Sequence, residues 1–415
     1  MVQRRVVVTG LGALTPIGNN LPEFWKNLIN GQSGAAAITR FDTTKFKTKF
    51  ACEIKGYDPL NYFERSEVRK IDPFTQYALV STAEALKDSQ LELDKIDKRR
   101  VGVIWGSGNG GFQTFQNEVQ EFNKGDGTPR FNPYFIPKVI VDIASGWISI
   151  KYGFMGLNFT TVSACATSTT AIIDAMNYIR WGKADIIVAG GSEAAINESG
   201  IGGFSAMKAL STRNDDPAIA SRPFDEDRDG FVMGEGAGAL ILEEYEHAVK
   251  RGARIYAEVA GGGMSADAYH LTATHPEGEG AMLGMQWALE DAGLTVQDVD
   301  YLNPHATSTP VGDVSEMKAI YKLFSENKKL SISATKSSIG HLLGGAGAAE
   351  AIICIKAVQE NLIPPTINTQ VIDAQLPKGL DIVMGSKRQK EVNVALSNTF
   401  GFGGHNASLV VKKVS

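Results

Sequence analysis

Short runs of β-branched residues alternate with segments of helical period along the chain. The runs Arg5–Thr9, Val101–Trp105 and Asp185–Ala189 have the length and composition of buried strands. Between them, Thr75–Ser89 and Ala166–Arg180 place apolar residues at the three- and four-residue spacing of amphipathic helices. Strands that alternate with helices in this way predict a layered α/β fold with mostly parallel strand pairing.

Part of this pattern occurs twice. The segment Ala85–Asp97 has apolar and acidic residues in the same order and spacing as Ala288–Asp300, and a strand follows each segment. Farther along, the helical sequence A-I-I-D-A of Ala171–Ala175 resembles A-I-I-C-I of Ala351–Ile355. Chance similarity between amphipathic helices is the alternative, but it would not preserve order and spacing through helix, loop and strand.

This repetition indicates a duplicated unit. We expect two halves, residues 1–254 and 255–415, which pack against each other face to face. Because equivalent loops of the two halves would then lie on the same side of the molecule, residues from distant parts of the sequence would converge at one central site.

Bulk composition excludes several classes of protein. The chain has 415 residues and a formal net charge of -5, so no global basic field points to nucleic acid. No long apolar stretch lacks charges or breakers and no cleavage pattern follows the N-terminus, so we expect neither a membrane span nor a signal peptide. The three cysteines are widely spaced, which argues against a disulfide framework or zinc cluster and predicts a reducing, cytoplasmic location.

Cys165 is the strongest candidate for chemistry. It lies between an extended run, Phe159–Val162, and the predicted helix that begins at Ala166. The free N–H groups and positive dipole end of a helix stabilise a thiolate over a thiol, so we expect a nucleophile that carries a covalent intermediate. A small cysteine buried in the core is the alternative, and the residues around Cys165 alone do not decide between the two.

Two histidines lie in loops of the second half. His305 follows a predicted strand and precedes a helix expected to start near Val314, and His341 lies just before another apolar helix. Loops between regular elements are where active-site groups usually lie. Either histidine alone would be interpreted as structural, but two in matching positions favour a catalytic role together with Cys165.

Six motifs together resemble one family, the β-ketoacyl-acyl carrier protein synthases of the synthase II type. The resemblance covers nearly the whole chain, and each motif would be weak evidence alone. The motifs are V-V-V-T-G-L-G-A-L-T-P-I-G from Val6, V-S-A-C-A-T-S around Cys165, R-P-F-D-E-D-R-D-G-F-V-M-G-E-G-A-G from Arg222, H-A-T-S-T-P-V-G-D from His305, T-K-S-S-I-G-H-L-L-G-G-A-G-A-A-E from Thr335, and N-T-F-G-F-G-G-H-N from Asn398.

The resemblance implies a thiolase-like, five-layered αβαβα fold of two duplicated halves, and a decarboxylating Claisen condensation that elongates fatty acids by two carbons. Cys165 would hold the acyl chain, while neutral His305 and His341 would donate N–H groups to the malonyl thioester oxygen. The backbone N–H groups of Cys165 and Phe402 would form a second oxyanion hole, and Phe402 would also gate acyl access. Gly401 and Gly403 would let this backbone approach closely.

The family also assigns supporting roles. Lys336 would form an ion pair with Glu350 that fixes the histidine loop, and Asp313 would support the site. The hydroxyl groups of Thr307 and Thr309 would bind the amide groups of a pantetheine arm.

Partners follow from the same resemblance. Malonyl- and acyl-carrier proteins would be the substrates, and the acidic carrier would dock on Arg69, Lys70 and Lys208. The protein would be a homodimer in which Asn109 lines an acyl tunnel across the interface. Family members commonly have an apolar residue at Asn109, so the preferred chain length stays open.

No cofactor is expected, because the substrates themselves carry phosphopantetheine. The resemblance does not decide whether a structural monovalent cation lies beneath the site. We expect no other metal, since a site built from His305, His341 and His405 lacks the ligand spacing of known metal motifs.

Four other protein classes share part of this sequence pattern. A thiolase needs a second cysteine in the C-terminal glycine loop, and Gly401–Asn406 contains none. A non-catalytic chain-length subunit would lack the nucleophile, whereas this chain has Cys165. A polyketide-type ketosynthase stays open as an alternative. A dinucleotide-dependent oxidoreductase is suggested by Gly10-x-Gly12, but Thr15-Pro16 stands where a Rossmann helix should carry glycine or alanine.

Overall fold

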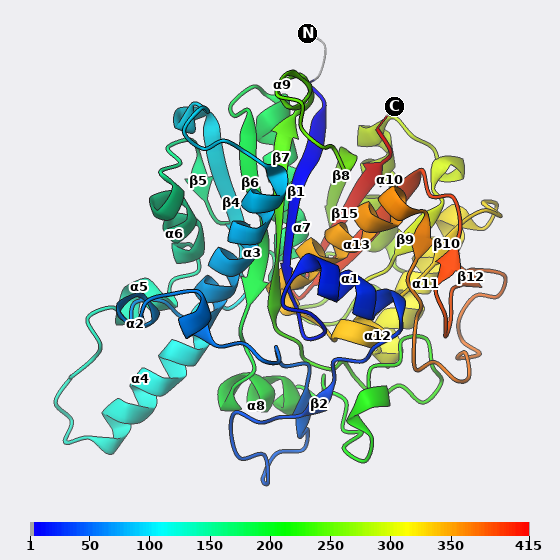
Figure 1. Cartoon of the computed structure of the whole chain (residues 1–415). Coiled ribbons are helices and arrows are strands. Elements are labelled where there is room, and N and C mark those ends of the chain that lie inside the picture. The colour runs from blue at the N-terminus through cyan, green and yellow to red at the C-terminus, as the bar shows by residue number, and fades with distance from the viewer. Residues whose placement is uncertain (1–3, 415) are drawn as a thin grey trace.

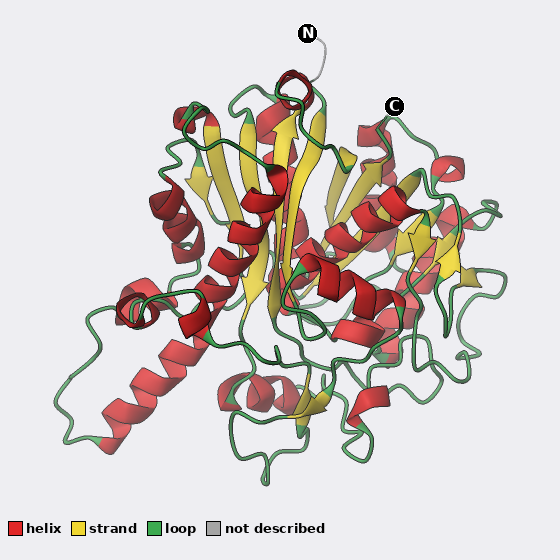
Figure 2. Ribbon diagram, in the orientation of Figure 1, coloured by secondary structure: helices red, strands yellow, loops and turns green. Residues whose placement is uncertain are grey.

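The computed structural model describes residues 4–414, so residues 1–3 and 415, at the outer ends of the two predicted halves, lie outside the described part. Eleven strands form one mixed sheet, with helices on its faces (Figures 1 and 2). In spatial order the strands are β12 (Asp381–Ile382), β10 (Ser331–Ile332), β9 (Tyr301–Asn303), β14 (Val394–Gly401), β15 (His405–Lys412), β8 (Ala257–Ala266), β1 (Val6–Leu14), β7 (Gly236–Glu244), β6 (Ile186–Glu193), β4 (Val101–Gly106) and β5 (Asn158–Phe159).

The sheet consists of two sets of strands with one topology. The order β5-β4-β6-β7-β1 on one side matches β10-β9-β14-β15-β8 on the other, and β12 extends the second edge. In each set the first three strands are parallel and the last two pairings are antiparallel. Within residues 4–414, strands of the two sets pair with each other where Val7 and Val8 of β1 lie opposite Glu258 and Ala257 of β8. The predicted fold of two duplicated halves is confirmed, whereas the boundary after residue 254 stays a prediction.

Helices form three further layers. On one outer face α3 packs on β1, β7 and β6, and on the other α10 packs on β8 and β15. Between the two sets lie α7 and α13, each of which contacts strands of both sets. These layers contain α3 (Pro73–Ser89) with α6 (Ile143–Tyr152), α7 (Thr167–Arg180) with α13 (Ala346–Glu360), and α10 (Glu279–Ala292) with α11 (Pro310–Phe324).

Seven further helices lie outside these three layers in the described residues. They are α1 (Leu21–Ile29), α2 (Arg65–Val68), α4 (Phe112–Lys124), α5 (Phe135–Val139), α8 (Glu198–Ala206), α9 (Tyr245–Lys250) and α12 (Lys336–Ile339). No helix among residues 4–414 is long and apolar enough to cross a membrane.

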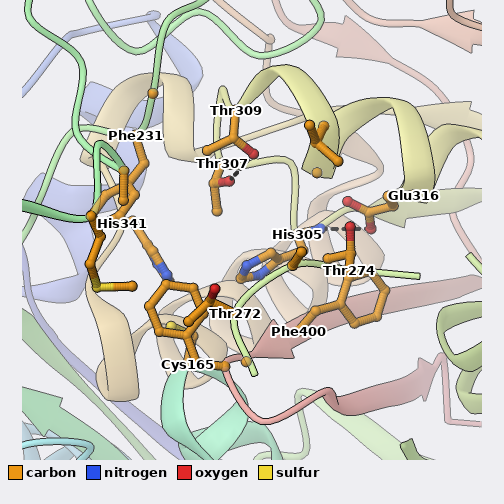
Figure 3. Close-up of a pocket in the computed structure, with 18 of the residues that line it drawn as sticks. Cys165, Phe231, Thr272, Thr274, His305, Thr307, Thr309, Glu316, His341 and Phe400 are labelled. Atoms are coloured by element: carbon orange, nitrogen blue, oxygen red, sulfur yellow. Dashed lines mark hydrogen bonds between the residues drawn. The ribbon is translucent and has the colours of Figure 1, made fainter. Parts of the chain in front are cut away.

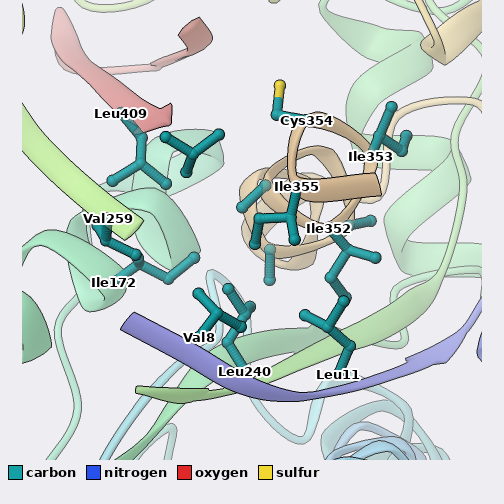
Figure 4. Close-up of a cluster of buried hydrophobic side chains, with 14 of the residues drawn as sticks. Val8, Leu11, Ile172, Leu240, Val259, Ile352, Ile353, Cys354, Ile355 and Leu409 are labelled. Atoms are coloured by element: carbon teal, nitrogen blue, oxygen red, sulfur yellow. The ribbon is translucent and has the colours of Figure 1, made fainter. Parts of the chain in front are cut away.

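The centre of the core is the helix α13. Nearly all of its side chains are buried, as expected of a helix that is apolar on every side. Ile352 and Ile355 of α13 lie near Leu11 of β1 and Leu240 of β7, and Leu409 of β15 reaches the same cluster from the other set (Figure 4). Full burial of each such side chain stabilises the fold by about 1.5–3 kcal/mol, so this helix binds the two sets together.

Several predicted element boundaries were wrong. Strand β1 continues to Leu14 rather than ending at Thr9, and β6 continues to Glu193 rather than ending at Ala189. The helix after Cys165 begins at Thr167, because Ala164–Ala166 form a 3₁₀ turn (η3) in which Ala164 has φ of 50°. The helix expected near Val314 begins at Pro310 as α11, since proline fits the first helical position, where its missing N–H is not needed.

Candidate active site

A cavity of about 380 Å³ brings the predicted catalytic residues together. Cys165, His305, His341 and Phe402 all line it, although they come from distant parts of the sequence. Figure 3 shows both imidazole rings pointing into the space beside Cys165. Cys165 precedes α7, His305 follows β9, His341 follows α12, and Phe402 follows β14. The shared topology of the two sets therefore places these loops at one site.

His341 is fixed through its backbone. Its N–H donates to the carbonyl of Val232 over 2.8 Å, and its carbonyl accepts from the N–H of Gly234 over 2.8 Å. Gly340, with φ of 68°, turns the chain just before it. A Cβ at Gly340 would lie 2.8 Å from the sulfur of Cys52, so the close packing there requires glycine.

His305 is fixed by a carboxylate that the sequence did not reveal. Glu316 of α11 accepts the N–H of His305 over 2.8 Å and that of Ala306 over 2.7 Å. Burial raises the pKa of Glu316 to about 7, although these N–H groups act in the opposite direction. The three-residue spacing of Asp313 and Glu316 on a helix would have been a signal for one acidic face.

The two histidines form a close, neutral pair. Their ring centroids lie 5.2 Å apart with an interplanar angle of 89°. Burial and the neighbouring Lys336 cation hold the pKa of both imidazoles well below the usual range. Each uncharged ring carries one N–H, and the Nδ1 atoms of both lack a hydrogen-bond partner among the described residues. The pair can therefore donate two hydrogen bonds to one oxygen without carrying positive charge.

The expectation of a readily ionised thiolate at Cys165 was wrong. Burial raises the pKa of the Cys165 thiol to about 12, and the Glu193 carboxylate acts in the same direction. Lys336 and the N–H groups of Phe402 and of Cys165 itself lower the pKa without offsetting the burial. The helix begins two residues after the sulfur and apolar side chains surround the thiol, so the resting group is protonated.

Lys336 and Glu350 form an ion pair beneath the cavity. Lys336 is 1% exposed and Glu350 is 0% exposed, so neither charge contacts solvent. Burial raises the pKa of Glu350 to about 7, and the Lys336 cation opposes that rise. Removing either partner would leave an uncompensated charge in the core, which is strongly unfavourable.

Asp313 holds the loop after His305. Its carboxylate accepts the N–H groups of Ser308 over 3.1 Å, Thr309 over 3.3 Å and Phe224 over 3.0 Å. Burial raises its pKa to about 6, against the effect of Arg228, whose Nε lies 3.4 Å away. Ser308 has φ of 70°, so these bonds stabilise a conformation that serine rarely adopts.

The predicted substrate-binding residues divide into two groups. Thr307, Thr309 and Gly401 line the cavity, and the two threonine hydroxyls lie 3.2 Å apart. Gly403 lies outside the lining and donates its N–H to the carbonyl of Leu271 over 2.7 Å. Asn109 is exposed and also lies outside the lining; its N–H donates to Glu193 over 3.1 Å.

The predicted docking residues are also spread out. Lys208 is exposed and lines the cavity, with φ of 55° just after α8. Arg69 and Lys70 follow α2 and do not line the cavity. The Nζ atom of Lys70 lies 5.8 Å from the centroid of the Tyr134 ring.

No group of three or more His, Cys, Asp or Glu residues suited to a metal ion occurs within residues 4–414. His405 is exposed and does not line the cavity with His305 and His341. The structure therefore argues against the three-histidine metal site.

Comparison with known proteins agrees with this geometry. Residues 3–248 match the family described as "Beta-ketoacyl synthase, N-terminal domain", and residues 256–370 match "Beta-ketoacyl synthase, C-terminal domain". The chain belongs to the β-ketoacyl synthase family. Among relatives of this β-ketoacyl synthase, the 3-oxoacyl-[acyl-carrier-protein] synthase 2 of Vibrio cholerae is 46% identical over 417 residues and covers 100% of both chains.

Solved structures of ketosynthases have the same fold as this β-ketoacyl synthase. The ishigamide ketosynthase/chain length factor superimposes with a TM-score of 0.93 at 33% identity and covers 100% of both chains. AntDE:AntF, a type II PKS acyl-carrier protein in complex with its ketosynthase, gives a TM-score of 0.90 at 33% identity over 100% of both chains. The alternatives of a thiolase or an oxidoreductase are therefore not supported.

Close packing beside the nucleophile gives a testable prediction for this β-ketoacyl synthase. A Cβ at Gly401 would lie 2.6 Å from the Ser163 carbonyl oxygen and 2.9 Å from the Cys165 nitrogen. We expect Gly401→Ala to lower the free energy of unfolding by about 1–3 kcal/mol, because the backbone must shift. Chemical denaturation measures this change. Gly203→Ala is the control, since a Cβ there meets nothing within 4 Å; equal stability of both variants would contradict the prediction.

Proposed function

We propose that this chain is a 3-oxoacyl-acyl carrier protein synthase of type II, an acyltransferase that elongates fatty acids by two carbons. The observation that carries the proposal is one cavity in which the Cys165 sulfur faces two uncharged imidazoles, with the N–H groups of Cys165 and Phe402 beside the sulfur. The name and full-length similarity of the Vibrio cholerae relative support the same activity. The chain also keeps the nucleophile that a chain-length subunit would lack.

The first half-reaction moves an acyl chain to the protein. The Cys165 sulfur attacks the thioester carbonyl of an acyl-carrier protein, and the N–H groups of Cys165 and Phe402 bind the oxyanion that forms. The carrier thiolate leaves and takes the proton that Cys165 releases, so the step exchanges one thioester for another. The thiol must give up its proton as the sulfur attacks, and the leaving sulfur takes up one proton, so the exchange has no net change in protons.

The second half-reaction forms the carbon–carbon bond. A malonyl thioester loses carbon dioxide, and the electron pair of the broken bond forms an enolate whose oxygen accepts hydrogen bonds from His305 and His341. The enolate carbon attacks the acyl-Cys165 carbonyl. Collapse of that intermediate releases the 3-ketoacyl product and a Cys165 thiolate, which takes up one proton.

The remaining residues position these groups. Lys336, paired with Glu350, keeps the imidazoles uncharged, and Asp313 fixes the loop that carries Thr307 and Thr309. We assign the threonine hydroxyls to the amide groups of the pantetheine arm. Phe402 packs near Phe204, with ring centroids 6.2 Å apart, and could admit the acyl chain by turning away from it.

The carrier protein is the proposed partner. The AntDE:AntF structure holds an acyl-carrier protein on its ketosynthase. In this chain Lys208 lies at the cavity mouth, where it would steer an acidic carrier, and Arg69 and Lys70 would extend that surface. We place the reaction in the cytoplasm, because Cys52, Cys165 and Cys354 are all unpaired.

We further propose a homodimer built at the edge strand β5. Strand β5 is the outermost strand of its set. Among the described residues it pairs only with β4, so its other edge is open. Exposed apolar side chains surround it, including Ile150 at 73%, Met155 at 68% and Val162 at 51% exposed. An open edge next to apolar side chains is typical of a two-fold interface. Asn109 is exposed in the single chain, so a partner could complete a tunnel at this residue.

A monovalent cation fits beneath the site. Four oxygen atoms there, those of Tyr301 OH, Asn303 Oδ1, Ser397 Oγ and Glu350 Oε2, are buried and lack a hydrogen-bond partner among the described residues. Asn303 and Ser397 are directly paired across β9 and β14. A hard cation would satisfy oxygen ligands of this kind and would supply positive charge beside Glu350.

Loss of the nucleophile and loss of a histidine should separate the two half-reactions. Cys165→Ala should abolish transfer of a labelled acyl chain from its carrier but leave some malonyl decarboxylation. His305→Ala should slow decarboxylation about 10²–10³-fold, because one hydrogen bond to the enolate is lost. His247→Ala, a histidine on α9, is the control. Full malonyl turnover by His305→Ala would refute the assigned role, and carriers with graded chain lengths would reveal the preferred substrate.

The dimer can be tested by charge at the open edge. Sedimentation should show a dimer for the wild-type chain and a monomer for Val162→Lys, since a buried unpaired ammonium opposes association. Val249→Lys on α9 is the matched control, because Val249 is 50% exposed and Val162 is 51% exposed. A wild-type chain that sediments as a monomer at micromolar concentration would exclude the interface.

Binding of the cation should raise the thermal stability of the folded chain. The melting temperature should be higher in potassium or sodium chloride than in choline chloride at equal ionic strength, because an ion that binds only the folded chain stabilises it. Ser397→Ala should remove most of that difference. If melting is equal in all three salts, no such ion is bound.

A further inference from the structure

The two central helices begin in the same way but with different residues. Each follows a 3₁₀ turn whose first residue has a left-handed conformation, Ala164 with φ of 50° before α7 and Leu343 with φ of 49° before α13. The second residue of the first turn is Cys165. The second residue of the other turn is Gly344, so the second half has a glycine at the position of the nucleophile.

The strands that follow these helices also correspond. Both β6 and β14 have eight residues, and the last residue of each pairs with the first of the next strand. That last residue is Glu193 in β6 and Gly401 in β14. Because Gly401 has no side chain, the N–H groups near Cys165 remain free for a substrate oxygen. At the equivalent position, beside Gly344 of the second half, strand β6 of the first half has a carboxylate.

The Glu193 carboxylate occupies the equivalent space. Its Oε2 atom accepts the N–H of Gly344 over 3.0 Å and that of Gly108 over 2.9 Å. Its Oε1 atom accepts the N–H of Asn109 over 3.1 Å and the Ser107 hydroxyl over 3.1 Å. Glu193 is 0% exposed. A Cβ at Gly344 would lie 2.7 Å from Oε2, and one at Gly108 would lie 2.9 Å away, so both glycines make room for this carboxylate.

We propose that Glu193 is a positioning residue of the first half that fills the anion hole beside Gly344, the counterpart of the hole beside Cys165 that serves the reacting carbonyl. The Gly344 N–H is the equivalent of the Cys165 N–H. It donates a hydrogen bond to the Glu193 carboxylate, whereas the Cys165 N–H is left for a substrate oxygen. The hydrogen bonds of Glu193 connect the turn that follows His341 to the loop after β4. The inference rests on the proposed function, since it takes the Cys165 and Phe402 N–H groups as the hole that binds substrate.

Glu193 also contributes charge to the nucleophile. The titratable groups that affect Cys165 or line its cavity are Lys336, Glu193, Glu316, Lys208, Asp229, Asp267, His305 and His341. Besides burial, which raises the pKa of the thiol most, the Lys336 cation lowers this pKa and the Glu193 carboxylate raises it. The charge of Glu193 thus adds to the effect of burial on the thiol, while its hydrogen bonds fix the loops around it.

The test is the pH profile of Cys165 alkylation in Glu193→Gln. Iodoacetamide reacts with the thiolate, so the rate reports the thiol pKa, and peptide mass mapping assigns the modified residue. Removing the negative charge should move the profile to lower pH, with a rate at pH 8.5 at least about threefold above wild type. The kcat of elongation should fall about tenfold or more, with KM changed less, because the loops are less well fixed.

Ser107→Ala is the matched control, since it removes one hydrogen bond to Glu193 and leaves the charge; its alkylation profile should equal that of wild type. An unchanged profile in a folded Glu193→Gln variant overturns the proposal. If that variant does not fold, Glu193→Ala is assayed with formate, which should refill the hole and raise both melting temperature and kcat. No gain over chloride at equal ionic strength also overturns it. Alkylation needs no substrate, so failure of the proposed reaction would be recognised separately.

Discussion

One buried ammonium group acts on three reactive side chains of the cavity. Burial is the largest influence on the pKa values of His305, His341 and Cys165, and the Lys336 cation lowers all three values. A cation in the core is tolerated only with a close counter-charge, and Glu350 provides it. The effect on the imidazoles matters most. Two imidazolium rings would bind the malonyl carboxylate and oppose its loss, whereas uncharged rings favour the enolate that decarboxylation leaves behind.

Strained backbone gathers around the same cavity. Ala164, Leu343, Ala306 and Ser308 all have positive φ, which costs of order 1–3 kcal/mol for a residue with a side chain. Three buried carboxylates stabilise these segments: Asp313 and Glu316 bind the loop after His305, and Glu193 binds the turn of Leu343. Each accepts several backbone N–H groups, so rigid loops depend on acidic side chains that need not touch substrate.

The sequence predicted the layered fold and the duplication, because strand runs and helical spacing are local signals. It also predicted that Cys165, His305 and His341 would lie together, which they do. It could not predict the state of the Cys165 thiol. Helix position alone favours a thiolate, but burial among side chains from other loops outweighs it. Glu193 was missed for the same reason, since its donors lie in segments about 85 and 151 positions away. The start of α11 was also missed, because Pro310 begins the helix and the pattern of apolar residues does not take proline into account.

The central layer has a consequence for how such a chain could arise. Both α7 and α13 bury one side against their own strand set and the other against the opposite set. A polypeptide consisting of only one half would expose a broad apolar helix face to water, and it would remain dissolved only if a second molecule covered that face. A self-associating unit that was duplicated and fused would give this arrangement, with the central helices covered within one chain and a cysteine in only one of the two equivalent turns.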